Sequence, residues 1–147
     1  MDLKTQIQTS LKDAMRSGDE LRKNTLRMAL AAIKFAEVEK GAHMDENAYL
    51  AILHKEVKSR RESIADAQRA NRPDLIQAAE AEIAVLETFL PKALSEAELE
   101  NLARQVIAEV GATSLREMGQ VMKTLMPRLQ GRATGDQASQ VVRKLLQ

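Results

Sequence analysis

Hydrophobic residues recur at spacings of three and four along most of the chain, which is the pattern of amphipathic α-helices. Leu3, Ile7 and Leu11 begin the first predicted helix, and Ser17-Gly18-Asp19 ends it. The pattern predicts further helices over about residues 20–40, 45–70 and 75–90, then three shorter helices that begin at capping sequences near residues 95, 114 and 134. Alternating runs of β-branched residues are absent from the sequence. We therefore expect an all-α fold.

The segment from Pro91 to Ala93 is the natural boundary between two helical parts, because proline disfavours a helical residue before it. We expect an N-terminal four-helix domain over residues 1–91 and a small C-terminal three-helix domain over residues 92–147. The sixth helix carries a nearly ideal amphipathic stripe that includes Met118, Met122 and Met126, and we expect Pro127 to end it. These methionines are predicted to be core residues rather than a partner groove.

The composition excludes several classes of site. The 147 residues include no cysteine and two histidines, His43 and His54. Disulfides and thiol catalysis are thereby excluded, and two histidines are too few for most histidine-rich metal sites, so we expect no metal. No apolar run approaches the ~18 residues of a membrane span, and the start lacks a signal-peptide core. The sequence thus predicts a soluble, cytoplasmic protein with no membrane partner.

No catalytic or nucleotide-binding motif is visible. The phosphate-binding and dinucleotide-binding glycine motifs and the metalloprotease H-E-x-x-H are all absent. Neither histidine lies near a serine–acid arrangement typical of a catalytic triad, and both are expected at surfaces or helix ends. Acidic residues mostly lie four positions from Lys or Arg, as in solvated ion pairs on helix faces. We therefore name no catalytic residue and no cofactor, and favour a protein that is not an enzyme.

Charge is unevenly distributed along the chain. The overall net charge of +1 predicts no bulk attraction to nucleic acid or membrane. Residues 95–117 carry two arginines and five glutamates, a net charge of −3. Residues 118–147 carry five basic residues and one aspartate, a net charge of +4. The last thirty residues are therefore the part of the chain in which an anionic partner is expected.

A glycine-rich turn, residues 131–135, lies within this basic segment and just before the last predicted helix. A helix start offers free N–H donors and a favourable dipole, and glycines allow close backbone approach, so the turn is a candidate phosphate site. Alternatively, the glycines only permit a turn between two helices. The candidate RNA-binding residues are Lys123, Arg128, Gly131, Arg132, Gly135, Arg143 and Lys144.

A second basic group lies in the N-terminal part. Lys23, Arg27 and Lys34 form one row on the second predicted helix, between apolar residues such as Leu26 and Met28 on either side. Apolar residues on two faces predict a central helix of the bundle. The row then either meets acidic residues of neighbouring helices or contacts a ligand.

Two arginines of the third predicted helix complete the secondary basic candidates. Arg60 falls inside the apolar stripe of this helix, and Arg61 lies on its flank. A charge on an apolar face must be paired or must reach a groove, because burying it alone is very costly. Glu56, four residues earlier, is the expected partner of Arg60.

Several signatures, in this order, resemble those of the GatB/YqeY family, and the resemblance covers essentially the whole chain. They are Thr25-Leu26-Arg27-Met28, Ala31-Ala32-Ile33-Lys34, Lys55-Glu56-Val57-Lys58, Arg60-Arg61-Glu62-Ser63-Ile64, Phe89-Leu90-Pro91, Met118-Gly119 and Gly131-Arg132-Ala133. Two positions depart from the family pattern: Thr134 stands where Asp is usual, and Phe89 replaces the usual Tyr.

The resemblance implies an all-α protein whose C-terminal part is similar to the GatB tail of the glutamine-dependent aspartyl/glutamyl-tRNA amidotransferase. That tail binds tRNA, whereas other domains and subunits carry the amide chemistry. We interpret the family's carbon–nitrogen ligase activity, with glutamine as amide donor, as a property of the full enzyme. An autonomous amidotransferase is the hypothesis ranked last: this chain has no cysteine to serve as a glutaminase nucleophile, and an amidase-type serine, the remaining alternative, has no supporting motif.

Two functional hypotheses follow. The first is an RNA-binding accessory protein, with tRNA the favoured target, that contacts phosphates through Arg and Lys because only three aromatic residues are present. The alternative is a protein–protein adaptor that docks onto a tRNA-modifying or translation complex through the methionine-rich face of Met118 and Met122.

Overall fold

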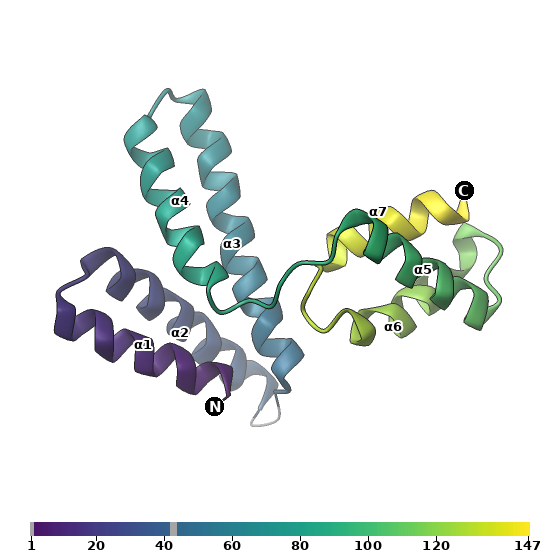
Figure 1. Ribbon diagram of the computed structural model, residues 1–147, viewed down its shortest axis with the longest axis horizontal. Helices are drawn as coiled ribbons and strands as arrows, with labels where there is room; N and C mark the ends of the chain where they lie inside the picture. Colours follow the sequence, from purple (N-terminus) through teal and green to yellow (C-terminus); the bar gives the residue numbers. More distant parts are fainter. Residues whose placement is uncertain (1, 42–43) are drawn as a thin grey trace. The chain divides into compact units, whose positions relative to one another are not determined.

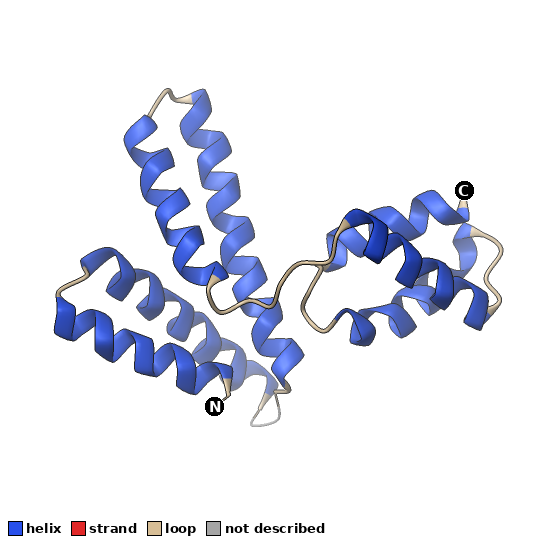
Figure 2. Cartoon of the chain, viewed as in Figure 1, coloured by secondary structure: helices blue, strands red, loops and turns tan. Residues whose placement is uncertain are grey.

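The computed structural model describes residues 2–41 and 44–147, so His43 lies outside the described residues. The described residues form helices joined by loops, without strands, which confirms the all-α prediction (Figure 2). The chain divides into two compact units, residues 1–90 and 91–147. Within the described part of the chain, no helix combines the length and apolar character needed to cross a bilayer.

The first unit consists of two helical hairpins (Figure 1). Its helices are α1 (Leu3–Ser17), α2 (Glu20–Lys40), α3 (Glu46–Arg69) and α4 (Pro73–Glu87). Aspartate side chains at positions 2, 19 and 45 accept backbone N–H bonds at the starts of α1, α2 and α3. Gly18 ends α1 in the left-handed region at φ 74°, which glycine adopts without steric cost.

The core of the first unit is aliphatic and draws on all four helices. Its buried residues are Leu3, Ile7, Leu26, Ala29, Ile33, Leu50, Leu53, Val57, Ile83 and Leu86. Because α1, α3 and α4 all pack against α2, this helix supplies the middle of the core, as expected. Thr25 is also fully buried, and its hydroxyl donates to the Leu21 carbonyl at 2.8 Å, which satisfies the polar group.

The expectation that α2 is buried on two faces is wrong. Met28, which lies on one of the two apolar faces, is 55% exposed, and Phe35, two turns further along the same face, is 67% exposed. The three neighbouring helices pack on the face of α2 that carries Leu26, Ala29 and Ile33, and leave the opposite apolar residues in solvent. Apolar residues on two sides of a helix therefore do not show that other helices pack against both sides.

A polar cluster ties α1, α2 and α3 together at the edge of this core. Lys4 Nζ lies 2.9 Å from Glu37 Oε1, and the Tyr49 hydroxyl donates to Glu37 Oε2 at 2.9 Å. The Lys4 hydrogen bond, followed by that of Tyr49, holds the pKa of the Glu37 carboxyl below its usual range. The members of this cluster lie far apart in sequence, so no local pattern predicts it.

The second unit is a small three-helix domain (Figure 1). Its helices are α5 (Glu96–Val110), α6 (Met118–Leu129) and α7 (Gly135–Leu146), and the short 3₁₀ turn η1 (Leu115–Glu117) precedes α6. Ser95 with Glu98 and Thr134 with Gln137 form the two predicted capping boxes at the starts of α5 and α7.

Two expectations for α6 need correction. Ser114 makes no side-chain cap bond, because the 3₁₀ turn intervenes before the helix. Pro127 does not end α6, which continues to Leu129 and stops where Gln130 and Gly131 both adopt positive φ. Pro127 gives up its own backbone hydrogen bond, and the residues after it nevertheless keep helical backbone as far as Leu129.

The core of the second unit joins one face of each of the three helices. Its buried residues are Leu99, Ala103, Val106, Val121, Leu125, Leu129, Ala133, Ala138, Val142 and Leu146. Met118 and Met122 are half-buried and pack against this cluster, as predicted. Met126 differs, since it is 40% exposed.

Candidate nucleic-acid interface

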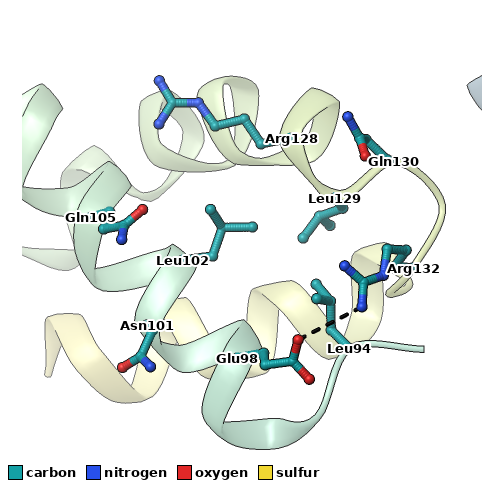
Figure 3. A pocket seen from close by; sticks show the side chains of 9 residues that line it. All are labelled: Leu94, Glu98, Asn101, Leu102, Gln105, Arg128, Leu129, Gln130 and Arg132. Carbon is teal, nitrogen blue, oxygen red and sulfur yellow. Dashed lines mark ion pairs between the residues drawn. The ribbon is translucent and has the colours of Figure 1, made fainter. Parts of the chain in front are cut away.

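A cleft of about 340 Å³ lies in the second unit, between α5 and the C-terminal end of α6 (Figure 3). Its lining combines leucines with amide and charged side chains: Leu94, Glu98, Asn101, Leu102, Gln105, Arg128, Leu129, Gln130 and Arg132. Arg128 and Arg132, both predicted RNA-binding residues, are thus brought to one cleft. Lys123, Arg143 and Lys144 do not line it.

Arg132 ties the turn before α7 to the segment before α5. Its backbone carbonyl accepts from Leu94 N–H at 2.8 Å, and its Nε donates to the Lys92 carbonyl at 2.9 Å. Its Nη2 lies 3.6 Å from Glu98 Oε2, the ion pair drawn in Figure 3. Arg132 is therefore largely committed to holding the second unit together, which leaves little of its guanidinium for a phosphate.

Arg128 is also paired inside the second unit. Its Nη2 lies 2.5 Å from Glu109 Oε2, in a pair that joins the end of α6 to α5. This hydrogen bond lowers the pKa of the Glu109 carboxyl and raises the pKa of Arg128. Both side chains remain substantially exposed, so solvent screens the pair and it is weak. An incoming phosphate could compete with Glu109 for Arg128.

The three remaining predicted cations are free in the described part of the chain. Lys123 on α6, and Arg143 and Lys144 in the last turn of α7, are exposed, and none of them forms an ion pair with a described residue. A cation without an internal partner loses no protein contact when it meets a phosphate. These three side chains are therefore the part of the predicted site best suited to bind an anion.

The start of α7 is already capped from within the chain. The Thr134 hydroxyl accepts from Gln137 N–H at 3.1 Å, and the Gln137 side chain accepts from Thr134 N–H at 3.0 Å. Asp136, in the first turn, also places a carboxylate near the positive end of the helix dipole. A phosphate at the start of α7 would therefore compete with the Thr134 hydroxyl for the N–H donors, and with the Asp136 carboxylate for the positive end of the helix dipole.

The two glycines of the turn differ in what they do. Gly131 has φ 72°, in the left-handed region, so the interhelical turn favours a glycine there. Gly135 has no positive φ and opens α7. A Cβ at Gly135 would meet the Met126 methyl at 3.6 Å, an ordinary contact. The turn explanation therefore accounts for Gly131 and leaves Gly135 without a steric reason.

No described residue of a neighbouring helix forms an ion pair with the basic row on α2. Lys23 pairs with Glu20, three residues earlier on the same helix, at 2.9 Å. Arg27 and Lys34 are exposed and make no ion pair with any described residue. Of the two alternatives for this row, pairing with acidic residues of neighbouring helices is therefore wrong for the described residues.

Arg60 and Arg61 are structural in the first unit. Arg60 is 6% exposed, and its guanidinium pairs with Glu56 at 3.6 Å, as expected, and with Glu82 on α4 at 3.1 Å. The Glu82 contact was missed, since nothing in the sequence places position 82 opposite position 60. Arg61 pairs with Glu87 on α4 at 3.2 Å, in an exposed bridge.

Within residues 2–41 and 44–147, no group of three His, Asp or Glu side chains has the proximity needed to hold a metal ion. Every buried side-chain polar atom described in the structure has a hydrogen-bond partner. The described interior therefore offers no unsatisfied polar group that would point to a bound molecule.

Comparison with known proteins extends these findings. Residues 4–146 match the family model described as Yqey-like protein. "Altered inheritance of mitochondria protein 41, mitochondrial" of Lachancea thermotolerans is 32% identical over 75% of this chain and 60% of its own length. The protein of that name from Meyerozyma guilliermondii is 34% identical over 71% of this chain and 56% of its own. The one from Pyrenophora tritici-repentis is 29% identical over 86% and 71%.

These relatives bear on two points. The chain spans about three fifths of the length of the first two of them, so each has sequence outside the shared region. Their names place the relatives in mitochondria, which overturns the cytoplasmic localisation expected from the sequence. That expectation relied on missing membrane and signal segments, and such absences do not distinguish one compartment from another.

Proposed function

Because the chain belongs to the Yqey-like protein family, we propose that it is an RNA-binding accessory protein whose second unit binds the phosphate backbone of tRNA. The single observation that carries the proposal is that Lys123, Arg143 and Lys144 are exposed and form no ion pair with a described residue. Phosphate contacts by Lys and Arg release counterions from the nucleic acid, and this release supplies most of the affinity that does not depend on sequence.

The cleft supplies a second set of groups for the same ligand. Arg128 forms only an exposed pair with Glu109, and Asn101, Gln105 and Gln130 bring amide donors and acceptors to the same cleft. Amides can hydrogen-bond to ribose hydroxyls or base edges, which an RNA presents where its strands are unpaired. The cleft therefore supports RNA rather than a bare anion as the ligand.

The resemblance of residues 92–147 to the GatB tail of the amidotransferase is a further support, since that tail binds tRNA. In this proposal the chain delivers or positions tRNA and does not carry out the amide transfer. A carbon–nitrogen ligase that uses glutamine needs a nucleophile for the glutaminase step. This chain contains no cysteine, and none of its serines lies in a visible amidase motif.

An adaptor acting through Met118 and Met122 is less well supported. Both side chains are half-buried and pack against the core of the second unit, so little of their surface is left for a partner. Polar substitution of either residue would act first on folding of this unit.

The proposal is tested by binding of fluorescently labelled bulk tRNA to the full chain at low salt. A Lys123→Gln, Arg143→Gln, Lys144→Gln triple variant should bind more weakly. A Lys12→Gln, Arg16→Gln, Lys55→Gln variant, which removes the same charge from exposed positions of the first unit, should bind as the parent does. Equal weakening by both variants would mean that the affinity for tRNA follows the net charge of the chain and not these three side chains. Failure of the parent to bind would refute the proposal.

A further inference from the structure

The exposed face of α2 carries six residues at alternating spacings of three and four. We call this set the α2 stripe: Leu21, Asn24, Met28, Ala31, Phe35 and Val38. The spacing is that of the a and d positions of a heptad repeat, the seam through which helices pair in coiled coils. Along the helix axis the stripe extends for about 25 Å.

The α2 stripe is mostly uncovered in the described structure, although the Met28 sulfur lies 3.7 Å from Arg60 Nη2 on α3. Its large apolar members are 36% (Leu21), 55% (Met28), 67% (Phe35) and 78% (Val38) exposed. Single exposed apolar residues are ordinary on protein surfaces, whereas a continuous row of them marks an interaction site. The core of the first unit uses the opposite face of α2, so the stripe is not needed for that packing.

Two cations flank the α2 stripe on one side. Arg27 and Lys34 are seven residues apart and occupy successive g positions of the same heptad register. Both are exposed, and neither forms an ion pair with a described residue. Charges at g positions select the partner of a coiled-coil seam, because they lie opposite the charges that edge the partner helix.

This charge pattern disfavours a second copy of the chain as the occupant. An antiparallel pair of α2 helices would place the g rows of the two copies together, so Arg27 and Lys34 would face like charges. A parallel pair would bring Lys34 toward Glu39 of the other copy but leave Arg27 opposite Ala32. A different helix with carboxylates along its edge satisfies both cations.

We propose that the α2 stripe is the docking site for an amphipathic helix of a protein partner, with apolar residues along its seam and Asp or Glu along the edge that meets Arg27 and Lys34. Asn24, the one polar residue in the stripe, fixes the register of this pairing, as polar residues at seam positions do. The site lies in the first unit and is independent of the tRNA-binding groups of the second.

The probe for this proposal is a labelled synthetic helical peptide with leucine at its a and d positions and glutamate at its e and g positions. A matched peptide carries lysine in place of every glutamate. Like charges along both edges keep each peptide from pairing with itself. Fluorescence anisotropy with the full chain should give affinity about tenfold higher for the glutamate peptide, since two cations attract one peptide and repel the other.

Variants of the full chain locate the contact. Arg27→Glu with Lys34→Glu should reverse the preference between the two peptides. Lys12→Glu with Arg16→Glu, which makes the same charge change at exposed positions of α1, should leave the preference unchanged. Phe35→Ser should weaken binding, and Met15→Ser, at a 52% exposed methionine outside the stripe, should not.

Three results would overturn the proposal. One is equal affinity for the two peptides, or no binding of either. Another is loss of the preference in the Lys12, Arg16 control. The third is a dimer in sedimentation equilibrium that Phe35→Ser dissociates, because the stripe would then be covered by a second copy. None of these outcomes depends on RNA, so the proposed function stands or falls separately.

Discussion

The Arg60 guanidinium on α3 lies 3.1 Å from the Glu82 carboxylate on α4 and joins two helices across the edge of the first core. Arg60 also donates to the Glu56 carbonyl at 3.0 Å, and its Nη2 lies 3.7 Å from the sulfur of Met28 on α2. One nearly buried charge thus meets groups on three helices.

We expect Glu82→Ala to lower the free energy of unfolding by about 1–2 kcal/mol, because it leaves the Arg60 charge buried with only Glu56 as a partner. Arg60→Met should cost less, since the long apolar chain remains and both glutamates can turn to solvent. Arg61→Met, which removes an exposed bridge, should change stability by no more than about 0.5 kcal/mol. Urea denaturation of the three variants measures these differences, and an equal cost for Glu82→Ala and Arg61→Met would contradict this account.

The Lys4–Glu37–Tyr49 cluster predicts a stability difference that depends on pH. The Lys4 hydrogen bond holds the pKa of Glu37 below its ordinary value of 4.5. A carboxyl with a lower pKa in the folded state stabilises the protein above its unfolded pKa and loses that contribution as the pH falls through the folded value. Glu37→Gln should therefore be less stable than the parent at neutral pH, and the difference should shrink as the pH falls below 4.5.

Denaturation midpoints across a neutral-to-acid series measure this difference. Glu39→Gln is the matched control, since it removes an exposed carboxylate of the same helix that forms no ion pair with a described residue. A Glu37→Gln deficit that stays constant down to acidic pH would contradict an electrostatic role for the cluster.

The two glycines of the α6–α7 turn predict opposite results. Gly131→Ala should destabilise the second unit by about 1 kcal/mol, since its φ of 72° strains any residue with a Cβ. Gly135→Ala should be neutral or slightly stabilising, because its backbone is not left-handed and its Cβ would make an ordinary contact. Hydrogen exchange at α7 amides reports both effects. If Gly135→Ala weakens tRNA binding with stability unchanged, close backbone approach by a phosphate is the reason for that glycine.

Arg132 and Arg143 are assigned different roles: Arg132 stabilises the second unit, whereas Arg143 belongs to the proposed phosphate-binding set. Arg132→Ala removes the bond to the Lys92 carbonyl and the Glu98 pair, and should destabilise the second unit by about 1 kcal/mol. Arg143→Ala removes an exposed side chain without an ion pair in the described structure, and should change stability by less than about 0.5 kcal/mol. Hydrogen exchange at α5 and α7 amides distinguishes the two. Comparable losses would contradict the different roles assigned to them.

Local sequence signals predicted the helices and their caps well. Apolar spacing placed α2, and the Ser95 and Thr134 capping boxes placed the starts of α5 and α7. Such signals depend on residues within one or two turns of each other, which a sequence displays directly.

Contacts between residues far apart in the sequence could not be predicted from it. The exposure of Phe35, the Glu82 partner of Arg60 and the bond from Arg132 to Lys92 all depend on how helices meet. The candidate interface changed most for this reason. Arg132 holds parts of the second unit together, whereas Lys123, Arg143 and Lys144, which form no ion pair with a described residue, are now its best-supported members.

The most direct test of the central claim is tRNA affinity measured across a salt titration, with the Lys123→Gln, Arg143→Gln, Lys144→Gln variant beside the parent. If these side chains contact phosphates, the affinity of the parent falls as salt rises. The log–log slope should then shrink by about two units or more in the variant, since each lost phosphate contact removes about one. An unchanged slope, or no binding by the parent at low salt, would contradict the account.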